Sequence, residues 1–539
     1  MELITAHRLW RDYDYSALPL NETLIREEKA DNYKIEYIYF NGEPTQDGCV
    51  RIFARVYTPT DRKPLAGMVL CNDANDPFDM TYTSILLQNG YTVIVPDYAG
   101  KRDSGLYTIY PYSLRSANFF SEESDFNSLP NNPKLHSHFS YACVMLRAYC
   151  YLKQKGSFRS GKIGFFGVRE GALSVYKAAF VEPEAFCAIA LFNSCYIPSL
   201  DIKSEEANLY NSCLANQTYA ALLTVPTYII ESSNNSENSL FSSSALYTVS
   251  SNSVSMYIAE HSDNTLSSSQ TKSLVAFVNN HRNGKVDMAS YPIIEAKNSD
   301  RQLYFNITIP SPKKVVGVSA YHTFGNGRGA YRNWLKLPLV KISETEYLCK
   351  VDVFLPKDEM SAFVTVKYEN DFCLSSEILT RIPLLLGVAS KNIIKSRLVY
   401  DADMGTEAWL VTKSKLSSSS VFIKKGGKGI EGVTGSTNSV TSLSIGDIRT
   451  QGEQDSTLQL LIYSEKQQTL DIQITCLIED EYLSYSTTKW VSSFGEWSKI
   501  TLSSNEFKSD HGTMDGWQDA VCITINSESE LLINSVVWI

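Results

Sequence analysis

The sequence predicts an α/β domain with a mostly parallel, helix-covered sheet, followed by two all-β sandwich domains. Two observations predict this fold class. Uninterrupted apolar segments alternate with amphipathic segments in the first half of the chain, as in a parallel sheet buried on both faces. From Tyr291 onward, short alternating segments without a convincing helix indicate antiparallel strands. Because 539 residues exceed what one hydrophobic core supports, we predict domains at 1–285, 286–390 and 391–539.

The first domain begins with a hairpin and continues as strands and helices in alternation. The segment VRIFARVYTP has a period of two and predicts a half-buried strand over Val50–Tyr57, paired with Lys34–Phe40. Further strands are predicted at Leu65–Cys71, Tyr91–Pro96, Lys162–Phe166, Phe186–Phe192, Pro226–Ile230 and Val254–Ala259. Helices are predicted at Tyr82–Gln88, His138–Leu152, Ala172–Phe180 and Ser267–Asn280. Together these elements make a mixed sheet of about eight strands.

The second and third domains contain strand patterns only. A small immunoglobulin-like sandwich is predicted from strands at Leu303–Ile309, Lys314–Tyr321, Leu348–Phe354 and Ala362–Tyr368. In the third domain we predict strands at Ser420–Lys424, Leu458–Tyr463, Asp471–Glu479, Trp497–Thr501, Ala520–Ile525 and Leu531–Trp538.

Charge and composition exclude some classes of function. The net charge of -10 argues against binding to nucleic acid or to an anionic membrane surface. No apolar segment reaches the ~20 residues of a membrane span, and the N-terminus does not read as a secretion signal. The eleven cysteines lack metal-ligand spacing. We therefore expect a cytoplasmic protein; a surface location stays open if a leader has been removed.

The segment KIGFFGVREGALSVYKAAF, Lys162–Phe180, has the layout of a nucleophile elbow. A buried strand runs into Gly167, three residues follow, and Gly171 begins a helix. In an active hydrolase this pattern is G-x-S-x-G, and the turn holds the serine above the sheet. Here the middle residue is Arg169. A guanidinium is always protonated and cannot attack a carbonyl carbon, so the sequence predicts a protein that is not a working serine or cysteine hydrolase.

On these residues the chain resembles the dienelactone hydrolase and acetyl xylan esterase branch of the α/β-hydrolase superfamily. The segment GMVLCNDANDPFDM, Gly67–Met80, is similar to the family's strand and oxyanion loop. The segment TVIVPDYAGKRDSG, Thr92–Gly105, is similar to the next strand and its loop. The resemblance runs from Lys34 to Arg282 and implies an α/β-hydrolase fold for the first domain.

The resemblance also places the other two members of a catalytic triad. The acid position falls on Asn235 in ESSNNSENS, and the histidine position on His261 in VSMYIAEHSDN. With Arg169 at the elbow, one member of three survives, so we expect no catalytic residue. Glu231 and Glu237 are close enough to replace the acid, but neither repairs the missing nucleophile.

Three interpretations of the elbow arginine stay open. Arg169 can pair with a carboxylate, namely Asp73, Asp76 or Glu231, which we favour, or it can form a pocket for a carboxylate or phosphate ligand. A relocated nucleophile is the third, with candidates Cys71, Ser174, Ser194 and Cys195, each more simply a core or turn residue. We interpret His261 as a partly buried remnant. For His136 and His138 we favour an exposed pair at a helix start over a metal site.

The third domain contains motifs of its own. The segments RLVYDADMGTEAW (Arg397–Trp409) and GEWSKITL…DGWQDA…INSVVWI (Gly495–Ile539) resemble jelly-roll carbohydrate-binding modules and galactose-binding-like domains. Sugars stack on aromatic faces, which makes candidates of Trp409, Trp490, Trp517 and Tyr482. We expect Trp497 and Trp538 in the core. Structural calcium is common in such domains, with Asp401 and Asp403 as guesses for its ligands; no other cofactor is predicted.

The leading hypothesis for function is a non-catalytic α/β-hydrolase homologue that binds or scaffolds a ligand, with a glycan or acylated glycan as partner. The alternative is a carbohydrate esterase, acyl hydrolase or acyl transferase with an unorthodox nucleophile or with His261 as general base. A third hypothesis is a structural assembly protein whose partner is another protein or a second copy of this chain.

Overall fold

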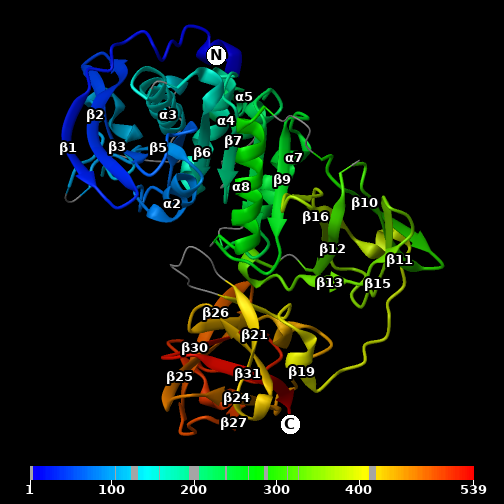
Figure 1. The fold of residues 1–539 in the computed structure, drawn as a ribbon. Helices are drawn as coiled ribbons and strands as arrows, with labels where there is room; N and C mark the ends of the chain where they lie inside the picture. The colour runs from blue at the N-terminus through cyan, green and yellow to red at the C-terminus, as the bar shows by residue number, and fades with distance from the viewer. Residues whose placement is uncertain are drawn as a thin grey trace.

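The N-terminal domain is built on a nine-stranded mixed sheet. The computed structural model describes residues 4–102, 105–122, 132–156, 158–193, 205–236, 239–264, 266–284, 289–311, 313–325, 327–411 and 420–539. The sheet has the order β1-β2-β3-β5-β4-β6-β7-β8-β9 (Figure 1). Its strands are β1 (Thr23–Lys29), β2 (Tyr33–Thr45), β3 (Gly48–Pro59), β4 (Ala66–Cys71), β5 (Tyr91–Pro96), β6 (Ile163–Val168), β7 (Ala188–Leu191), β8 (Thr227–Ser232) and β9 (Val254–Ala259). The first three strands are antiparallel, β3 is antiparallel to β5, and the strands from β5 to β9 are parallel.

This sheet confirms the predicted mixed, mostly parallel architecture. The strands β4 to β9 are buried along almost their whole length, which explains their uninterrupted apolar sequence. One strand was not predicted: β1 is exposed at all seven positions, so it carries no apolar alternation.

Helices cover both faces of the sheet. They are α1 (Ala6–Trp10), α2 (Met80–Gln88), α3 (Ser137–Gln154), α4 (Val175–Val181), α5 (Glu205–Cys213), α6 (Asn216–Ala220), α7 (Ser239–Thr248) and α8 (Ser268–Arg282). One core cluster joins one face of the sheet to α3, α4 and α7, and another joins the opposite face to α2 and α8. The chain start belongs to this domain, because the indole nitrogen of Trp10 donates to the Tyr219 hydroxyl over 2.8 Å. Among the described residues, no helix combines the length and apolarity that a membrane crossing needs.

The middle domain consists of two antiparallel sheets. One has the order β10-β11-β15-β14, and the other β13-β12-β16-β17 with β18 paired to β16. The strands are β10 (Ile293–Ser299), β11 (Gln302–Thr308), β12 (Val315–Phe324), β13 (Leu335–Leu337), β14 (Val340–Lys341), β15 (Glu346–Val351), β16 (Met360–Tyr368), β17 (Cys373–Ser375) and β18 (Leu379–Arg381). All four predicted strands are present, and the additional ones are short or lie at sheet edges.

The middle domain shares a hydrophobic core with the N-terminal domain. A single buried cluster includes Tyr228 and Phe277 from the first domain and Phe372 from the second. At the sheet edge, the Ile258 amide donates to the Ser375 hydroxyl over 2.9 Å, and the Thr365 hydroxyl donates to the Ile258 carbonyl over 3.2 Å. Hydroxyl groups thus satisfy backbone groups of β9 that no further strand pairs.

The C-terminal domain has two antiparallel sheets around its own core. One sheet has the order β21-β22-β31-β24-β27, with β19 paired to β31, and the other β20-β23-β30-β25-β26-β28-β29. The strands are β19 (Leu398–Asp401), β20 (Trp409–Val411), β21 (Val421–Lys425), β22 (Glu431–Gly435), β23 (Ser439–Ser442), β24 (Thr457–Ser464), β25 (Gln468–Ile478), β26 (Glu481–Val491), β27 (Glu496–Ser503), β28 (Lys508–Ser509), β29 (Gly512–Thr513), β30 (Ala520–Ser527) and β31 (Leu531–Trp538). All six predicted strands are present.

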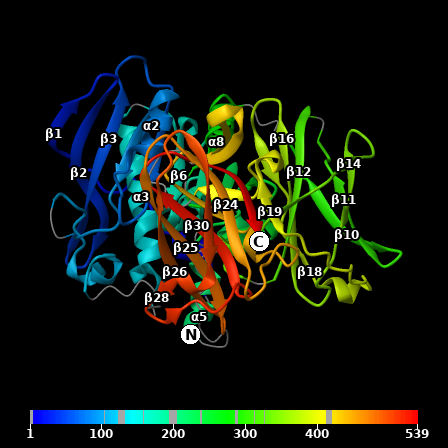
Figure 2. The same ribbon diagram turned by 90° about the horizontal axis from the view of Figure 1, so that it is seen from below.

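The C-terminal domain lies against the edge of the N-terminal sheet at which the parallel strands end. In Figure 1 the arrowhead of β9 points toward this domain. Seen from below, the C-terminal domain lies in front of α3 and β6 (Figure 2). The loops that follow β4, β6 and β8 therefore face it.

Candidate functional site

The turn after β6 is a tight elbow with arginine at its tip. Arg169 has a φ of 50°, in the left-handed region that residues with a side chain seldom adopt. A Cβ at Gly171 would lie 2.2 Å from the Cys71 carbonyl oxygen, and one at Gly167 would lie 2.5 Å from the Ala172 Cα. Neither position can accept a side chain without a shift. The Gly-x-Arg-x-Gly segment therefore has the geometry of a nucleophile elbow, without the nucleophile.

The side chain of Arg169 is paired with Asp73. The Nη1 atom lies 2.6 Å from the Asp73 Oδ2 atom, and the two side chains are 32% and 17% exposed. Of the three carboxylates that the sequence offers, the structure selects the one in the loop after β4. The elbow and the loop after β4 are thus joined by a charge-assisted hydrogen bond.

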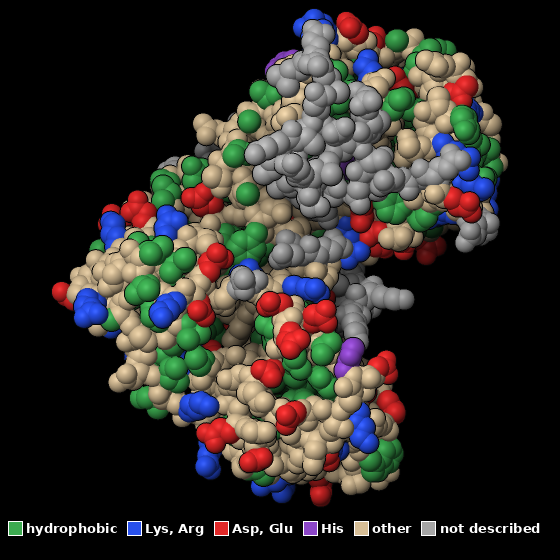
Figure 3. Space-filling view, turned by 180° about the vertical axis from the view of Figure 1, so that it is seen from behind, with side chains coloured by type: hydrophobic (Ala, Val, Ile, Leu, Met, Phe, Trp, Pro, Cys, Tyr) green, Lys and Arg blue, Asp and Glu red, His purple; other side chains and the backbone are tan. Residues whose placement is uncertain are grey.

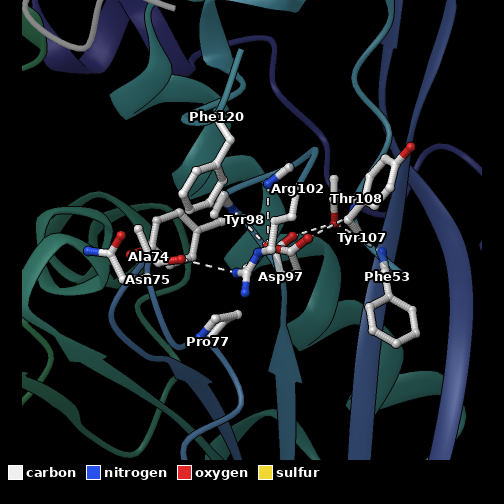
Figure 4. Close-up of polar contacts among 12 residues, drawn as sticks. Phe53, Ala74, Asn75, Pro77, Asp97, Tyr98, Arg102, Tyr107, Thr108 and Phe120 are labelled. Carbon is white, nitrogen blue, oxygen red and sulfur yellow. Dashed lines mark hydrogen bonds and ion pairs between the residues drawn. The ribbon is translucent and has the colours of Figure 1, made fainter. Parts of the chain in front are cut away.

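A second arginine holds the loop that carries Asp73. Figure 4 shows Arg102 between this loop and the end of β5. Its Nη2 atom donates to the Ala74 carbonyl over 3.0 Å and lies 3.6 Å from Asp97 Oδ1. Asp97 is almost fully buried and accepts the Thr108 amide at 2.8 Å. Desolvation raises the pKa of Asp97, and the hydrogen bonds and Arg102 oppose that rise.

The residue at the histidine position lies against the middle domain. His261 follows β9 with a φ of 45°, and its ring meets Tyr321 of the middle domain edge to face at 5.7 Å. The ring is half-buried, and its enclosed Nε2 atom has no hydrogen-bond partner among the described residues. Burial lowers its pKa to about 4, so the imidazole is neutral near pH 7. His261 does not belong to the lining of the cleft that contains Arg169.

The residue at the acid position is an amide that is bonded within the interior of the domain. Asn235 is fully buried, and its side-chain amide donates to Ser239 Oγ over 2.6 Å and to Glu231 Oε2 over 3.3 Å. Glu231 also accepts the Asn193 amide at 2.8 Å and the hydroxyls of Ser239 at 3.0 Å and Ser243 at 2.5 Å. Burial raises the pKa of Glu231 to about 7. Glu231 is thus an interior acid in a polar network, and it is not the partner of Arg169.

The candidates for a relocated nucleophile are buried or lie outside the described residues. Cys71 is 1% exposed, and burial raises its thiol pKa far above the ordinary value, which makes it a poor nucleophile. Ser174 is also 1% exposed, in the turn that starts α4. Ser194, Cys195 and the alternative acid Glu237 lie outside the described residues.

A cleft of about 1040 Å³ opens above the elbow, between the N-terminal and C-terminal domains. Its N-terminal wall contains Arg169, Asp73 and three further carboxylates, Asp76, Asp79 and Asp263. Partial burial is the main cause that raises the pKa of Asp76; the charges of Asp79 and Asp73 add to the rise, and Arg102 opposes it. Figure 3 shows a notch here between the lower lobe and the upper body, with acidic side chains along its upper rim.

The opposite wall of the cleft is one face of the C-terminal domain. Leu410 and Cys522 contribute apolar atoms to it. It also contains hydroxyl and amide groups, from Thr441, Gln473, Thr475, Ser484 and Thr524. These residues come from β23, β25, β26 and β30 of the seven-stranded sheet. None of these residues belongs to a motif, so the sequence did not predict them as a site; the alternating Ser and Thr residues of β26 are the signal that indicates a polar face.

Contacts with the middle domain hold the C-terminal domain in place. The rings of Tyr331 and Tyr482 stack at 4.4 Å with an interplanar angle of 19°, and the Arg328 amide donates to the Tyr482 hydroxyl over 3.0 Å. An ion pair joins Lys336 to Glu407. These contacts fix how far the two walls of the cleft stand apart.

Two of the four predicted sugar-stacking aromatics are wrong. Trp409 and Trp517 are 1% and 0% exposed, because both point between the two sheets of the C-terminal domain. Tyr482 is half-buried in its stack with Tyr331. Trp490 is 61% exposed, so much of its ring is open to solvent. Trp538 is in the core as expected, whereas Trp497 is half-buried.

The predicted metal ligands have other roles. Asp401 accepts the Asp403 amide at 3.0 Å and caps a short helical turn. The expectation that His136 and His138 are exposed is wrong: they are 2% and 1% exposed. His136 Nδ1 accepts the His138 amide and caps α3, and Tyr210 contacts the His138 ring, so α5 covers the helix start. Within the described part of the chain, no group of three or more His, Cys, Asp or Glu side chains could hold a metal ion.

Comparisons with known proteins give structural likeness only. Neither the protein-family models nor the curated proteins match this sequence. Among solved structures, the acetyl xylan esterase of Paenibacillus sp. R4 is 12% identical, with 49% of this chain and 90% of that one covered and a TM-score of 0.38. Acetyl xylan esterase 1 of Thermoanaerobacterium sp. JW/SL YS485 is 12% identical, with 49% of this chain and 90% of that one covered and a TM-score of 0.34. The esterase domain of a Rhodothermus marinus protein is 14% identical, with 47% of this chain and 96% of that one covered and a TM-score of 0.30.

The fold of the N-terminal domain follows from its own geometry. It has a mixed sheet that is antiparallel at its start, a strand exchange between β4 and β5, and a glycine-flanked elbow after β6. The N-terminal domain of this chain is an α/β-hydrolase fold with an arginine at the tip of its elbow.

Proposed function

We propose that this protein binds a glycan, without hydrolysing it, in the cleft between its N-terminal and C-terminal domains. The observation that carries the proposal is the 2.6 Å ion pair of Arg169 with Asp73 at the elbow. It occupies the position from which an active hydrolase attacks its substrate.

Three features support the absence of hydrolysis. Arg169 cannot form an acyl bond, because a guanidinium is not a nucleophile. The ring of His261 packs against Tyr321 and lies outside the cleft lining. Asn235 is bonded to Glu231 and Ser239, which leaves it directed into the interior. A covalent acyl mechanism needs a nucleophile that is hydrogen-bonded to a histidine, which an acid in turn orients.

The walls of the cleft support a polyhydroxylated ligand. The C-terminal wall contains the exposed hydroxyl of Ser484 and the largely buried hydroxyls of Thr441, Thr475 and Thr524. A hydroxyl can both donate and accept hydrogen bonds. The cleft volume of about 1040 Å³ is at the upper end of the ~300–1,000 Å³ of small-molecule sites, which suits a ligand of several rings. Such a ligand would also exchange hydrogen bonds with the carboxylates of the opposite wall.

The first experiment asks for binding and turnover in the same preparation. Full-length protein is screened on a glycan array, and each hit is tested by thermal shift, since a ligand of the native state raises the melting temperature by mass action. The same protein is treated with a fluorophosphonate probe and with acetylated and aryl esters. We expect a glycan that raises the melting temperature, no covalent labelling, and no turnover above buffer.

A matched pair of variants locates the site. Arg169→Ala should weaken binding of the array hit at least tenfold, because a hydrogen bond to a charged group contributes about 1.5–3 kcal/mol. Arg159→Ala removes an exposed arginine outside the cleft and should leave binding unchanged. Three outcomes would each contradict the proposal: covalent labelling by the probe, turnover of an ester, or a glycan affinity that Arg169→Ala leaves unchanged.

A further inference from the structure

The polar wall of the cleft is one end of a longer polar surface. Along β26, alternate residues point away from the core of the C-terminal domain: Tyr482, Ser484, Ser486, Thr488 and Trp490. On the neighbouring strand β25 their cross-strand partners are Leu477, Thr475, Gln473, Asp471 and Thr469. Since cross-strand partners share one face of a sheet, these ten residues form one surface.

Hydrogen bonds between side chains continue this surface across β30 and β23. The hydroxyls of Thr441 and Thr524 lie 2.8 Å apart, and the Ser439 hydroxyl donates to Asn526 Oδ1 over 2.7 Å. Asn526 in turn donates to Asp471 over 3.4 Å. Between Tyr482 and Leu477 at one end and Trp490 at the other, the side chains on this face are short and carry hydroxyl, amide or carboxylate groups, so a long ligand can lie flat against them.

The surface connects the elbow cleft to an exposed tryptophan. Ser484 and Thr475 line the cleft, whereas Trp490 lies six positions farther along β26. At ~3.3 Å per strand residue, the distance from Ser484 to Trp490 is about 20 Å. A tryptophan face binds the apolar face of a sugar ring by stacking. One end of the surface thus offers an enclosed cleft, and the other an aromatic platform.

The charges along this path are mainly negative. Asp76, Asp79 and Asp263 line the cleft, and Asp471 lies on the sheet face. Positive charges are present on the path as well. In the cleft, Arg169 is paired with Asp73. On the sheet face, Lys508 is the cross-strand partner of Ser486, and Arg328 lies over the Tyr482 ring. Because the acidic groups are concentrated in the cleft, a carboxylated or sulfated chain end would meet repulsion there, whereas a neutral or amine-bearing one would not.

We infer that the cleft and the outer face of the seven-stranded sheet form one continuous site for a linear glycan that carries no acidic groups. The chain end lies in the cleft beside Arg169, and the chain runs over the hydroxyl-lined face to stack a ring on Trp490. The inference rests on the proposed function and adds the shape and charge class of the ligand. The two domains act as one binding unit, because neither the cleft nor the tryptophan alone spans the chain.

Chain length and charge are the variables that test this inference. Isothermal titration is performed on full-length protein with three series of graded length: neutral cello-oligosaccharides, amine-bearing chitosan oligosaccharides and anionic oligogalacturonates. We expect affinity in the neutral or the amine-bearing series to rise with length until the chain spans the path, and the anionic series to bind most weakly. Preference for oligogalacturonates, or an affinity independent of length, would overturn the inference.

Trp490→Ala tests the far end of the path. It should lower the affinity for long chains by about two- to tenfold, the range measured for aromatic stacking pairs, and leave disaccharides unaffected. Tyr112→Ala is the matched control, since Tyr112 is an aromatic residue of the N-terminal domain that is 76% exposed and lies outside the path. Ser486→Arg is a second variant that obstructs the middle of the path, and it should have the same length-selective effect.

The outcomes separate this inference from the proposed function. If Arg169→Ala lowers the affinity but Trp490→Ala and Ser486→Arg leave it unchanged, the continuous path would be overturned and binding in the cleft would stand. Equal losses for short and long chains would overturn the path in the same way. Failure of the wild-type protein to bind any neutral or amine-bearing chain would contradict both.

Discussion

The indole nitrogen of Trp334, in the middle domain, donates a 3.0 Å hydrogen bond to the backbone carbonyl of Ser233, just beyond β8 of the N-terminal domain. Next to it, the Asn234 side chain donates to the Arg332 carbonyl over 2.8 Å. The Trp334 ring is 1% exposed and packs edge to face on Phe363 at 4.9 Å. The middle domain therefore closes the end of the hydrolase sheet at which a catalytic acid and histidine would stand.

Trp334→Ala should destabilise both domains together. The substitution leaves a cavity in a shared core and an unsatisfied buried carbonyl, so we expect a loss of about 3–5 kcal/mol in the free energy of unfolding. Urea denaturation followed by circular dichroism measures it. Trp490→Ala, which removes a tryptophan that is 61% exposed, is the control and should change the free energy little. A loss below about 1 kcal/mol for Trp334→Ala would contradict a shared core.

Arg169→Ser should not produce an esterase. The variant supplies a hydroxyl at the elbow, but His261 remains packed against Tyr321 and Asn235 remains bonded to Glu231. We expect hydrolysis of p-nitrophenyl acetate to stay at the wild-type background, because no base activates the serine. If Arg169→Ser gained turnover that a second change, His261→Ala, abolished, the imidazole would be competent after all.

Glu231 should make stability depend on pH. Its pKa is about 7 in the folded protein and 4.5 in its ordinary state, so the folded protein holds this proton more tightly than the unfolded chain does. The stabilisation is complete below about pH 4.5 and is lost as the pH rises to about 7, on the order of 3 kcal/mol. Glu231→Gln, which cannot ionise, should lack this contribution.

The measurement is the difference in unfolding free energy between wild type and Glu231→Gln across this pH range. The buried histidines His261, His281 and His322, whose pKa values burial lowers to about 4, titrate equally in both proteins and cancel in the difference. A difference that does not change with pH would contradict the prediction, because it would mean that the pKa of Glu231 is the same in the folded and unfolded chains.

Tyr482→Ala should loosen the C-terminal domain. It removes the stack on Tyr331, which contributes about 0.5–1.5 kcal/mol, and leaves the exposed ion pair of Lys336 with Glu407, which contributes little. We expect a larger radius of gyration in small-angle X-ray scattering and faster proteolysis between the domains. Trp490→Ala on the same face of β26 is the control, and an unchanged radius of gyration for Tyr482→Ala would indicate that other contacts hold the domain.

Much of the N-terminal fold could be predicted because its signals are local. The strands β4 to β9 are continuous apolar segments, and the elbow is marked by two glycines that the backbone cannot replace. By contrast, α7 has the sequence SLFSSSALYT, in which buried serines bind Glu231. Its serines face the interior, so no apolar stripe signals the helix.

The site was harder to predict because it depends on how separate segments pack. A tryptophan in an alternating strand can face the core or the solvent; Trp409 is buried in the core, whereas Trp490 is exposed. His136 would be exposed at an isolated helix start, but α5 covers it. The far wall of the cleft depends on the docking of Tyr482 on Tyr331, which no local pattern encodes.

The crowding at Gly171, where an added Cβ would sit 2.2 Å from the Cys71 carbonyl oxygen, bears on how such proteins are recognised. The path of the main chain leaves no space for a Cβ at either glycine, whichever side chain occupies the tip of the elbow. A search pattern that requires serine at the tip finds chains with a nucleophile there and misses chains that have the same turn with another residue. A pattern built on the glycine spacing and the preceding buried strand would retrieve the shape, and leave reactivity to be judged from the tip residue separately.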